Sequence, residues 1–382
     1  MAKILFVNIV PNGSTGTICK NLYKAAEKQG HECYFAYGRG QDLEGFRTIR
    51  IGSKKDVYEH VIKSRFFDSC GFESKTATKR FLRQIDDIQP DIIHLHNLHG
   101  YYINIEMLFQ YLKMHSAIKV IWTLHDCWPF TGHCAHFQYE KCEKWKTGCY
   151  DCVRTHMYPQ SFVDRSPHNY EVKKQLLNGL PDMELITPSQ WLADLVKQSF
   201  LQNYFVSVIH NAIDPNIFHP TPSTILEDHG LSGKRVILGV ASPWKQRKGF
   251  ESFISLASKV SDRYHFVMIG VSDEEKKKLP SNILGLSRTE NQQELAKWYT
   301  AAYVYFNPTL EDNYPTTNLE AVSCGTPVLT FDTGGCKEAM LGYGLVVDNT
   351  IDEQLLDSVA KKTFTKEPMT DMISEYLKLY KE

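Results

Sequence analysis

The sequence has no long uninterrupted hydrophobic run. Its apolar N-terminal stretch, KILFVNIV, is only about eight residues long and is followed at once by PNGSTG, whereas a membrane-spanning helix needs roughly 18 to 20 apolar residues. We therefore interpret this stretch as a buried β-strand and not as a signal peptide or a membrane span. The lack of such a segment leads us to expect a cytoplasmic protein.

The sequence also lacks an excess of charge of one sign and any low-complexity tract. Lys and Arg number 43 against 44 Asp and Glu, so the formal net charge is -1. Because no strongly basic field points to nucleic acid or to an anionic membrane, any phosphate must be recognised locally. The turn PNGSTGT does not have the GxGxxG spacing, which argues against a dinucleotide-dependent enzyme.

What the sequence does contain is an alternation of short apolar strands and helical segments over 382 residues. A chain of this length suggests two domains, and near-continuous apolar strands separated by helices indicate parallel sheets covered on both faces. We therefore expect an α/β protein. Its predicted parts are a first domain over residues 1–217, a second domain over residues 218–365 and a C-terminal helix over residues 366–382, whose apolar face predicts that it packs back on the body.

Half of the ten cysteines lie in one segment, about residues 127–155. In a cytoplasmic chain of this size, such a cluster favours a metal or reduced thiols over disulfides. Four thiolates at this spacing can close a tetrahedral zinc site that folds a loop without an apolar core of its own; the ligands would be Cys134, Cys142, Cys149 and Cys152. His133 and His136 are reserve ligands. An iron–sulfur cluster and a set of reduced buried thiols are the alternatives.

The segment TLEDNYPTTNLEAVSCGTPVLTFDTGG, residues 309–335, combines acids, turn residues and an apolar strand that ends in Gly-Gly. It closely resembles the C-terminal signature of glycosyltransferase family 4, whose members are retaining enzymes with the GT-B fold. Further landmarks occur in the family's order: an N-terminal glycine loop, the pair His125-Asp126, the junction VIHNAIDPNIFHP and Lys248-Gly249. The resemblance is greatest to colanic-acid and exopolysaccharide-type transferases, which share the cysteine insertion. It implies two Rossmann-like domains that face each other across a cleft.

The resemblance also implies which residues bind the sugar nucleotide. In the family, one acid binds hydroxyls of the donor sugar and a second acid binds both ribose hydroxyls, because a carboxylate offers two acceptor oxygens. Asp312, in place of the usual Glu, and Glu320 match these positions, although acids near a helix start can also act simply as caps. The diphosphate would be held by a helix N-terminus and by basic residues. The full predicted donor set is Gly16, Arg247, Lys248, Asp312, Asn313, Tyr314, Thr316, Thr317, Asn318 and Glu320.

Histidines at two strand ends are candidates for the reaction and for the acceptor. By resemblance, His125 faces the donor sugar near its anomeric carbon, although a strand-end histidine is often structural; with Lys248 and Asp312 it forms the predicted catalytic set. His94 and His96 share one face of the strand in HLHNLHG. They could contact the acceptor or equally bind a metal, and we favour contacts with the acceptor. Asp126 is predicted to lie on the acceptor side as well.

These features predict a retaining glycosyltransferase of the hexosyltransferase type. It would move a sugar from a nucleoside diphosphate sugar to a saccharide or lipid-linked saccharide during surface polysaccharide biosynthesis, at times in peripheral contact with the inner membrane surface. No carboxylate stands out as a nucleophile, so family analogy favours same-face displacement without a catalytic metal. The alternatives are a GT-B-fold epimerase or phosphorylase and a non-catalytic sugar-nucleotide-binding protein.

Overall fold

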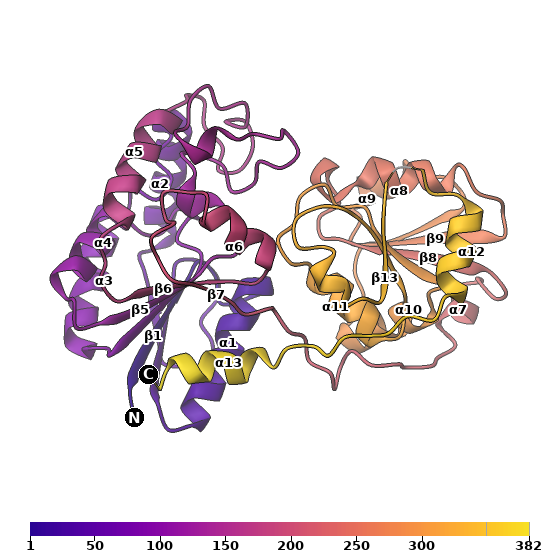
Figure 1. The fold of residues 1–382 in the computed structure, drawn as a ribbon, viewed down its shortest axis with the longest axis horizontal. Coiled ribbons are helices and arrows are strands. Elements are labelled where there is room, and N and C mark those ends of the chain that lie inside the picture. Colours follow the sequence, from indigo (N-terminus) through magenta and orange to yellow (C-terminus); the bar gives the residue numbers. More distant parts are fainter. Residues whose placement is uncertain (349, 382) are drawn as a thin grey trace. The chain divides into compact units, whose positions relative to one another are not determined.

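The computed structural model describes residues 1–348 and 350–381 of the chain, which form two compact units (Figure 1). The first unit comprises residues 1–210 and the chain from Asp371 onward, and the second comprises residues 211–370. The division therefore falls before the boundary predicted after residue 217. None of the helices described is both long and apolar enough to cross a membrane.

The first unit is built around a seven-stranded parallel sheet in the order β3-β2-β1-β4-β5-β6-β7. The chain moves outward from β1 in both directions, so the sheet is doubly wound and ligands are expected at the carboxyl ends of its strands. Neighbouring β4 and β5 pair with Leu95 opposite Trp122, which brings the residues after both strands to one edge. The strands are β1 Lys3–Asn8, β2 Glu32–Tyr37, β3 Thr48–Arg50, β4 Ile92–Leu95, β5 Lys119–Thr123, β6 Met183–Thr187 and β7 Val206–Val208.

Helices cover both faces of this sheet (Figure 1). They are α1 Gly13–Lys28, α2 Lys54–Phe67, α3 Lys75–Ile88, α4 Ile105–Met114, α5 Ser166–Leu177, α6 Gln190–Val196 and the C-terminal α13 Met372–Leu379. Helix α1 begins within the glycine loop, at Gly13. Helix α2 was not predicted; it buries only His60 and Ser64 and so carries no apolar stripe that a sequence pattern would reveal.

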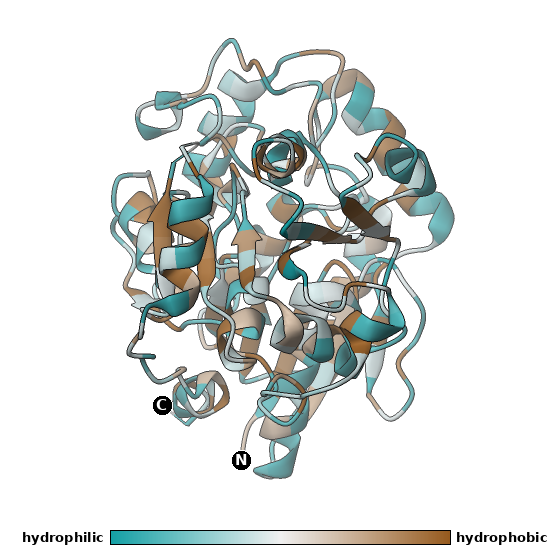
Figure 2. Cartoon of the chain, turned by 90° about the vertical axis from the view of Figure 1, so that its right-hand side faces the viewer, coloured by the Kyte–Doolittle hydropathy of each residue, from teal (hydrophilic) through white to brown (hydrophobic). Residues whose placement is uncertain are grey.

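The second unit contains a six-stranded parallel sheet in the order β10-β9-β8-β11-β12-β13. Two hydrophobic clusters pack around it, and in Figure 2 the strands are the brown segments, while the helices over them show teal outer faces. Its elements are β8 Arg235–Val240, β9 Tyr264–Ile269, β10 Ile283–Leu286, β11 Val304–Asn307, β12 Val328–Phe331, β13 Gly344–Val347, α7 Ile225–Asp228, α8 Phe250–Ala257, α9 Asp273–Lys276, α10 Gln292–Ala301, α11 Thr316–Ser323 and α12 Glu353–Lys361.

The C-terminal helix α13 packs against α1 of the first unit, which confirms that it folds back on the body. Tyr376 and Tyr380 are buried on its inner face, and the Tyr376 hydroxyl lies 2.9 Å from Thr123 Oγ1 at the end of β5. Lys119 Nζ donates to the Leu379 carbonyl at 2.9 Å. The two tyrosines and the lysine thus hold the last helix against the central strands β4 and β5.

The cysteine-rich insertion, residues 127–155, is described throughout and consists of two 3-10 turns, Trp128–Phe130 and Lys144–Lys146, joined by irregular chain. Its buried aromatic side chains belong to the hydrophobic core of the first unit. The rings of Phe137 and Trp145 stack with centroids 5.0 Å apart, and Phe130 lies 5.3 Å from Trp145. The insertion therefore extends the core of the first unit and does not contradict our expectation of a loop without an apolar core of its own.

Candidate active site

Two of the predicted site residues form an ion pair in the second unit. Lys248 ends the 3-10 turn Gln246–Lys248 after β8, and Asp312 follows β11, the neighbour of β8 in the sheet. Lys248 Nζ lies 2.5 Å from Asp312 Oδ2, and the two side chains are 23% and 19% exposed. The structure therefore brings these residues together at the carboxyl edge of the sheet, where parallel α/β sheets bind their ligands.

The two loops that carry this pair are held against each other. Arg247 donates from Nη1 to the Glu311 carbonyl at 2.8 Å, so this predicted phosphate ligand already fixes the backbone beside Asp312. Gly249 has a φ of +75°, and a Cβ added there would lie 2.0 Å from the Pro308 carbonyl oxygen. Only glycine suits both that backbone conformation and so close an approach.

Helix α11 presents a partly exposed edge next to this pair. Asp312, Thr316 and Glu320 recur every four residues and are all partly exposed, so in the helix Thr316 and Glu320 lie on one face. The Tyr299 hydroxyl donates to Glu320 Oε2 at 2.9 Å, and burial raises the pKa of Glu320 to about 7. The first turn follows Pro315 and, among the residues that the structure describes, has no acid and no capping side chain. Asn318 N donates to the Pro315 carbonyl at 3.1 Å, so the amides of Thr316 and Thr317 are the candidates for binding an anion.

The side chain of Asn318, a predicted donor residue, has a structural role. It is fully buried, its Oδ1 accepts from Asn307 Nδ2 at 2.8 Å, and its Nδ2 donates to the Cys336 carbonyl at 3.1 Å. The amide therefore joins β11 to the loop after β12. The side chain is thus turned toward the sheet, and the predicted contact with the donor, which rested on the backbone amides at the start of the helix, stays a prediction.

The loop between Asp312 and α11 is likewise fixed from within. The Tyr314 side chain is 4% exposed and belongs to the hydrophobic core of the second unit, so any contact with the donor would come from its backbone, as predicted for this helix entry. Asn313 is buried, and its carbonyl accepts from Gly335 N at 2.8 Å. Thr317 is partly exposed beside Thr316 and stays a predicted donor contact.

In the first unit, His125 pairs with His96. His96 Nδ1 lies 3.0 Å from His125 Nε2, and the rings stack with an interplanar angle of 13°. Burial lowers the pKa of His125 to about 4 and that of His96 well below its usual range, so both rings are neutral near pH 7. His96 Nε2 is buried, and no residue in the described part of the chain forms a hydrogen bond with it. Neutral imidazoles can position a hydroxyl by hydrogen bonding.

Asp126 belongs to a second network that the sequence did not reveal. Asp126 Oδ2 lies 2.7 Å from His99 Nε2, Oδ1 accepts from Trp128 N at 2.9 Å, and His99 Nδ1 lies 2.7 Å from the Tyr158 hydroxyl. Burial alone would raise the pKa of Asp126, but His99 brings it down to about 2. The strand-end position of His99 in HLHNLHG was the available signal, since β4 and β5 are neighbours.

His94 is not available to an acceptor. It is fully buried, and its two ring nitrogens lie 2.8 Å from the Tyr380 hydroxyl and 2.8 Å from Thr123 Oγ1. Both nitrogens are therefore used to connect the sheet with α13, and our assignment of His94 to acceptor binding was wrong.

Gly16 lies inside helix α1, where it is buried. A Cβ added there would lie 2.5 Å from the Pro11 carbonyl carbon and 2.8 Å from the Val10 carbonyl oxygen. Glycine is needed at this position because the helix packs on the end of its own loop. The predicted contact of Gly16 with the donor stays a prediction.

Two family models match this chain, one over each part of the sequence. Residues 15–217 match the family described as Glycosyltransferase Family 4, and residues 234–361 match the family described as Glycosyl transferases group 1. The chain belongs to glycosyltransferase family 4. It is a glycosyltransferase, as the sequence predicted.

Curated relatives of this transferase match it at low identity over much of their length. The putative colanic acid biosynthesis glycosyl transferase WcaC of Escherichia coli is 24% identical over 88% of this chain and 84% of the relative. The O-antigen chain mannosyltransferase RfbU of Salmonella typhimurium is 22% identical over 59% of this chain and 61% of the relative.

Solved glycosyltransferase structures share the fold of this transferase. Sucrose-phosphate synthase from Thermosynechococcus elongatus superposes with a TM-score of 0.64 at 14% identity and covers 94% of this chain and 88% of its own. Anabaena HepE in complex with UDP-glucose gives 0.61 at 13% identity, with 94% and 89% covered. The predicted GT-B fold class is therefore confirmed, because the chain has two parallel sheets with alternating helices and shares its fold with these structures.

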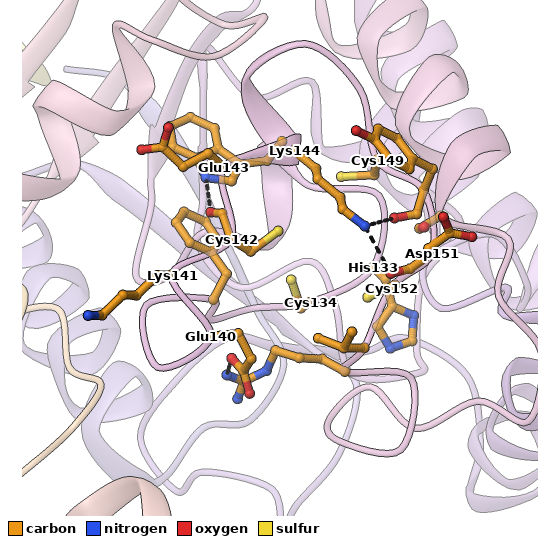
Figure 3. Close-up of a pocket in the computed structure, with 16 residues that line it drawn as sticks. His133, Cys134, Glu140, Lys141, Cys142, Glu143, Lys144, Cys149, Asp151 and Cys152 are labelled. Carbon is orange, nitrogen blue, oxygen red and sulfur yellow. Dashed lines mark hydrogen bonds and ion pairs between the residues drawn. The ribbon is translucent and has the colours of Figure 1, made fainter.

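The four cysteines predicted to bind zinc in this transferase line one cavity of about 310 Å³ within the insertion (Figure 3). Cys134 is buried, whereas Cys142, Cys149 and Cys152 are half-buried. Within residues 1–348 and 350–381, no three Cys, His, Asp or Glu side chains are already arranged to hold a metal ion. The thiols thus share a cavity without meeting at a single point.

Proposed function

We propose that this transferase moves a sugar, with retention of configuration, from a nucleoside diphosphate sugar to a saccharide or lipid-linked saccharide in surface polysaccharide biosynthesis. The ion pair of Lys248 and Asp312 beside the uncapped start of α11 carries the proposal. The relatives WcaC and RfbU, a putative colanic acid biosynthesis transferase and an O-antigen chain mannosyltransferase, support a role in surface polysaccharide biosynthesis. HepE, which has the same fold, was solved with UDP-glucose. A lipid-linked acceptor would bring the protein to the inner membrane surface.

On this proposal the second unit binds the donor through three kinds of group. The Glu320 carboxylate accepts hydrogen bonds from both ribose hydroxyls. The first-turn amides of α11, together with Lys248 and Arg247, hold the diphosphate. Asp312 accepts from a hydroxyl of the donor sugar. As the glycosidic bond breaks, the leaving diphosphate gains negative charge, which the ammonium group and the amides stabilise.

The first unit contributes neutral hydrogen-bonding groups to the reaction. His125 stays uncharged at neutral pH, because burial holds its pKa at about 4, so we assign it the positioning of a hydroxyl on the reacting sugar. Asp126 is used by His99 and Trp128 N and orients the loop after β5. Retention then proceeds by same-face displacement, in which a donor phosphate oxygen takes the acceptor's proton; we assign no carboxylate nucleophile.

Transfer from a panel of UDP-, GDP- and ADP-sugars to saccharide and polyprenyl-linked saccharide acceptors tests this proposal. We expect turnover with one nucleotide class and a product that keeps the donor's anomeric configuration by NMR. Glu320→Gln should weaken donor binding, whereas Glu290→Gln, at an exposed position, should not. An inverted product, or full activity in Glu320→Gln, would contradict the mechanism or the site.

A further inference from the structure

The cavity of the insertion is surrounded by thiols from separate parts of the loop. In Figure 3 the sulfur atoms of Cys134, Cys142, Cys149 and Cys152 surround the same space. Cys134 and Cys152 share a thiol–thiol hydrogen bond, although they are far apart in the loop. Four soft sulfur ligands around one cavity are the donor set of structural zinc sites.

A backbone amide and a buried ammonium group lie near the thiols. Gly132 N donates to Cys149 Sγ at 3.2 Å, a contact that stabilises a thiolate. The Lys173 ammonium is buried, donates to the carbonyls of Trp128 and Thr131 at 2.8 and 3.0 Å, and lies 3.5 Å from the Trp128 ring centroid. A zinc ion with four thiolates carries a net charge of -2, and a buried cation nearby offsets part of it.

His133 gives an independent indication of a cation at this cavity. Its ring lines the cavity, and Nδ1 donates to Asp68 Oδ1 at 2.6 Å. The remaining nitrogen, Nε2, is buried and has no hydrogen-bond partner among the residues that the structure describes, so it keeps its lone pair. Histidines at metal sites are held in this way by a carboxylate on the far nitrogen.

We propose that Cys134, Cys142, Cys149 and Cys152 bind one structural zinc ion, with the Asp68–His133 pair beside it. Zn–S bonds of about 2.3 Å require the four thiols to converge by side-chain rotation into the cavity they already line, since the described part of the chain holds no preformed set of three ligands. Four protons leave the thiols as the zinc binds. The ion then cross-links the irregular insertion that begins just after His125 and Asp126.

This site is independent of the sugar-transfer proposal, because the ion touches none of the residues assigned to the donor. Its role is to hold the insertion in one conformation. The aromatic core of Phe130, Phe137 and Trp145 packs one side of the loop, whereas the segment from Gly148 to Arg154 has no regular structure. Zinc would fix that segment through Cys149 and Cys152.

Metal analysis of the full-length protein, purified without chelator from cells supplied with zinc, tests the proposal. We expect about one zinc per chain, released when a mercurial reagent blocks the thiols. Cys142→Ser and Cys149→Ser should lower the zinc content at least about tenfold, whereas Cys33→Ala, which removes a buried thiol outside the insertion, should keep it. Wild-type protein with no zinc, or with iron instead, would overturn the proposal even if the variants failed to fold.

The ligand set is tested separately in cobalt-substituted wild-type protein and in His133→Asn. Four thiolates predict intense sulfur-to-cobalt charge-transfer bands that His133→Asn leaves unchanged. Loss of metal in His133→Asn together with full retention in one cysteine variant would overturn the four-cysteine set in favour of three cysteines and the histidine.

Discussion

Lys248 Nζ lies 2.5 Å from Asp312 Oδ2. The cation proposed for the leaving diphosphate is therefore held by the acid proposed for the donor sugar, and each group fixes the other before any donor binds. Because both side chains come from loops at neighbouring strand ends, the pair couples two parts of the proposed donor site.

Lys248→Ala is expected to lower kcat roughly 100-fold, because the leaving diphosphate loses its ammonium group, and to leave the unfolding midpoint almost unchanged. Steady-state kinetics with saturating donor measures the effect. Lys245→Ala serves as the matched control, since Lys245 lies in the same loop and is exposed. Equal activity of the two variants would remove Lys248 from the site.

Donor binding should depend on pH through Glu320, whose pKa burial raises to about 7. The carboxylate accepts both ribose hydroxyls, and protonation removes part of that capacity, so KM for the donor should rise roughly tenfold per pH unit well below pH 7. Glu320→Gln should flatten this profile. A wild-type KM that stays constant between pH 5.5 and 8 would contradict the role.

The raised pKa of Glu320 should affect folding stability in the direction opposite to its effect on donor binding: stability should fall as the pH rises. The folded second unit holds a proton on Glu320 that the unfolded chain releases above its ordinary pKa near 4.5. Relative to Glu320→Gln, the free energy of unfolding of the wild type should therefore be highest below about pH 4.5 and should fall as the pH rises through 7. Denaturant unfolding of both proteins across this range measures the difference.

Tyr380→Phe should destabilise the first unit by about 1–3 kcal/mol, because it leaves a buried nitrogen of His94 without its partner. The hydroxyl lies 2.8 Å from His94 Nδ1. Urea unfolding followed by fluorescence gives the free energy. Tyr58→Phe is the control, because Tyr58 is 67% exposed. A Tyr380→Phe protein as stable as the control would show that this contact does not hold the C-terminal helix.

The buried histidines predict a loss of stability in acid. Burial lowers the pKa of His94 to about 3 and that of His125 to about 4, from ordinary values near 6.5. The unfolded chain therefore takes up protons below pH 6.5 that the folded unit does not. The contribution of these neutral histidines to the free energy of unfolding is fully present above pH 6.5. For each histidine it falls toward pH 4 by up to about 1.4 kcal/mol per pH unit.

Unfolding free energies between pH 4 and 7 test this expectation. His125→Gln should reduce the slope, and His168→Gln, at an exposed position, should not. An unchanged slope in His125→Gln would show that this ring is not held neutral by the fold.

Parts of the candidate site could be predicted because their signals are local. Thr316 and Glu320 are four residues apart in α11, so their common exposure follows from the helical repeat, and Asp312 lies in the loop just before this helix. Asn318 lies in the same helix but is turned inward, and no local pattern shows which side meets the sheet. Likewise, His99 meets Asp126 only because β4 and β5 are neighbours in the folded sheet.

The amino-acid sequence by itself determined the α/β class, the parallel sheets and the family, since strand and helix periodicity and short motifs are local properties. Only the tertiary structure decided which polar side chains remain accessible. His94 shows why: its partner Tyr380 is 286 residues away. The packing of α13 on the first unit therefore turned a candidate binding residue into a structural one, because burial and hydrogen bonding between distant segments exist only in the folded chain.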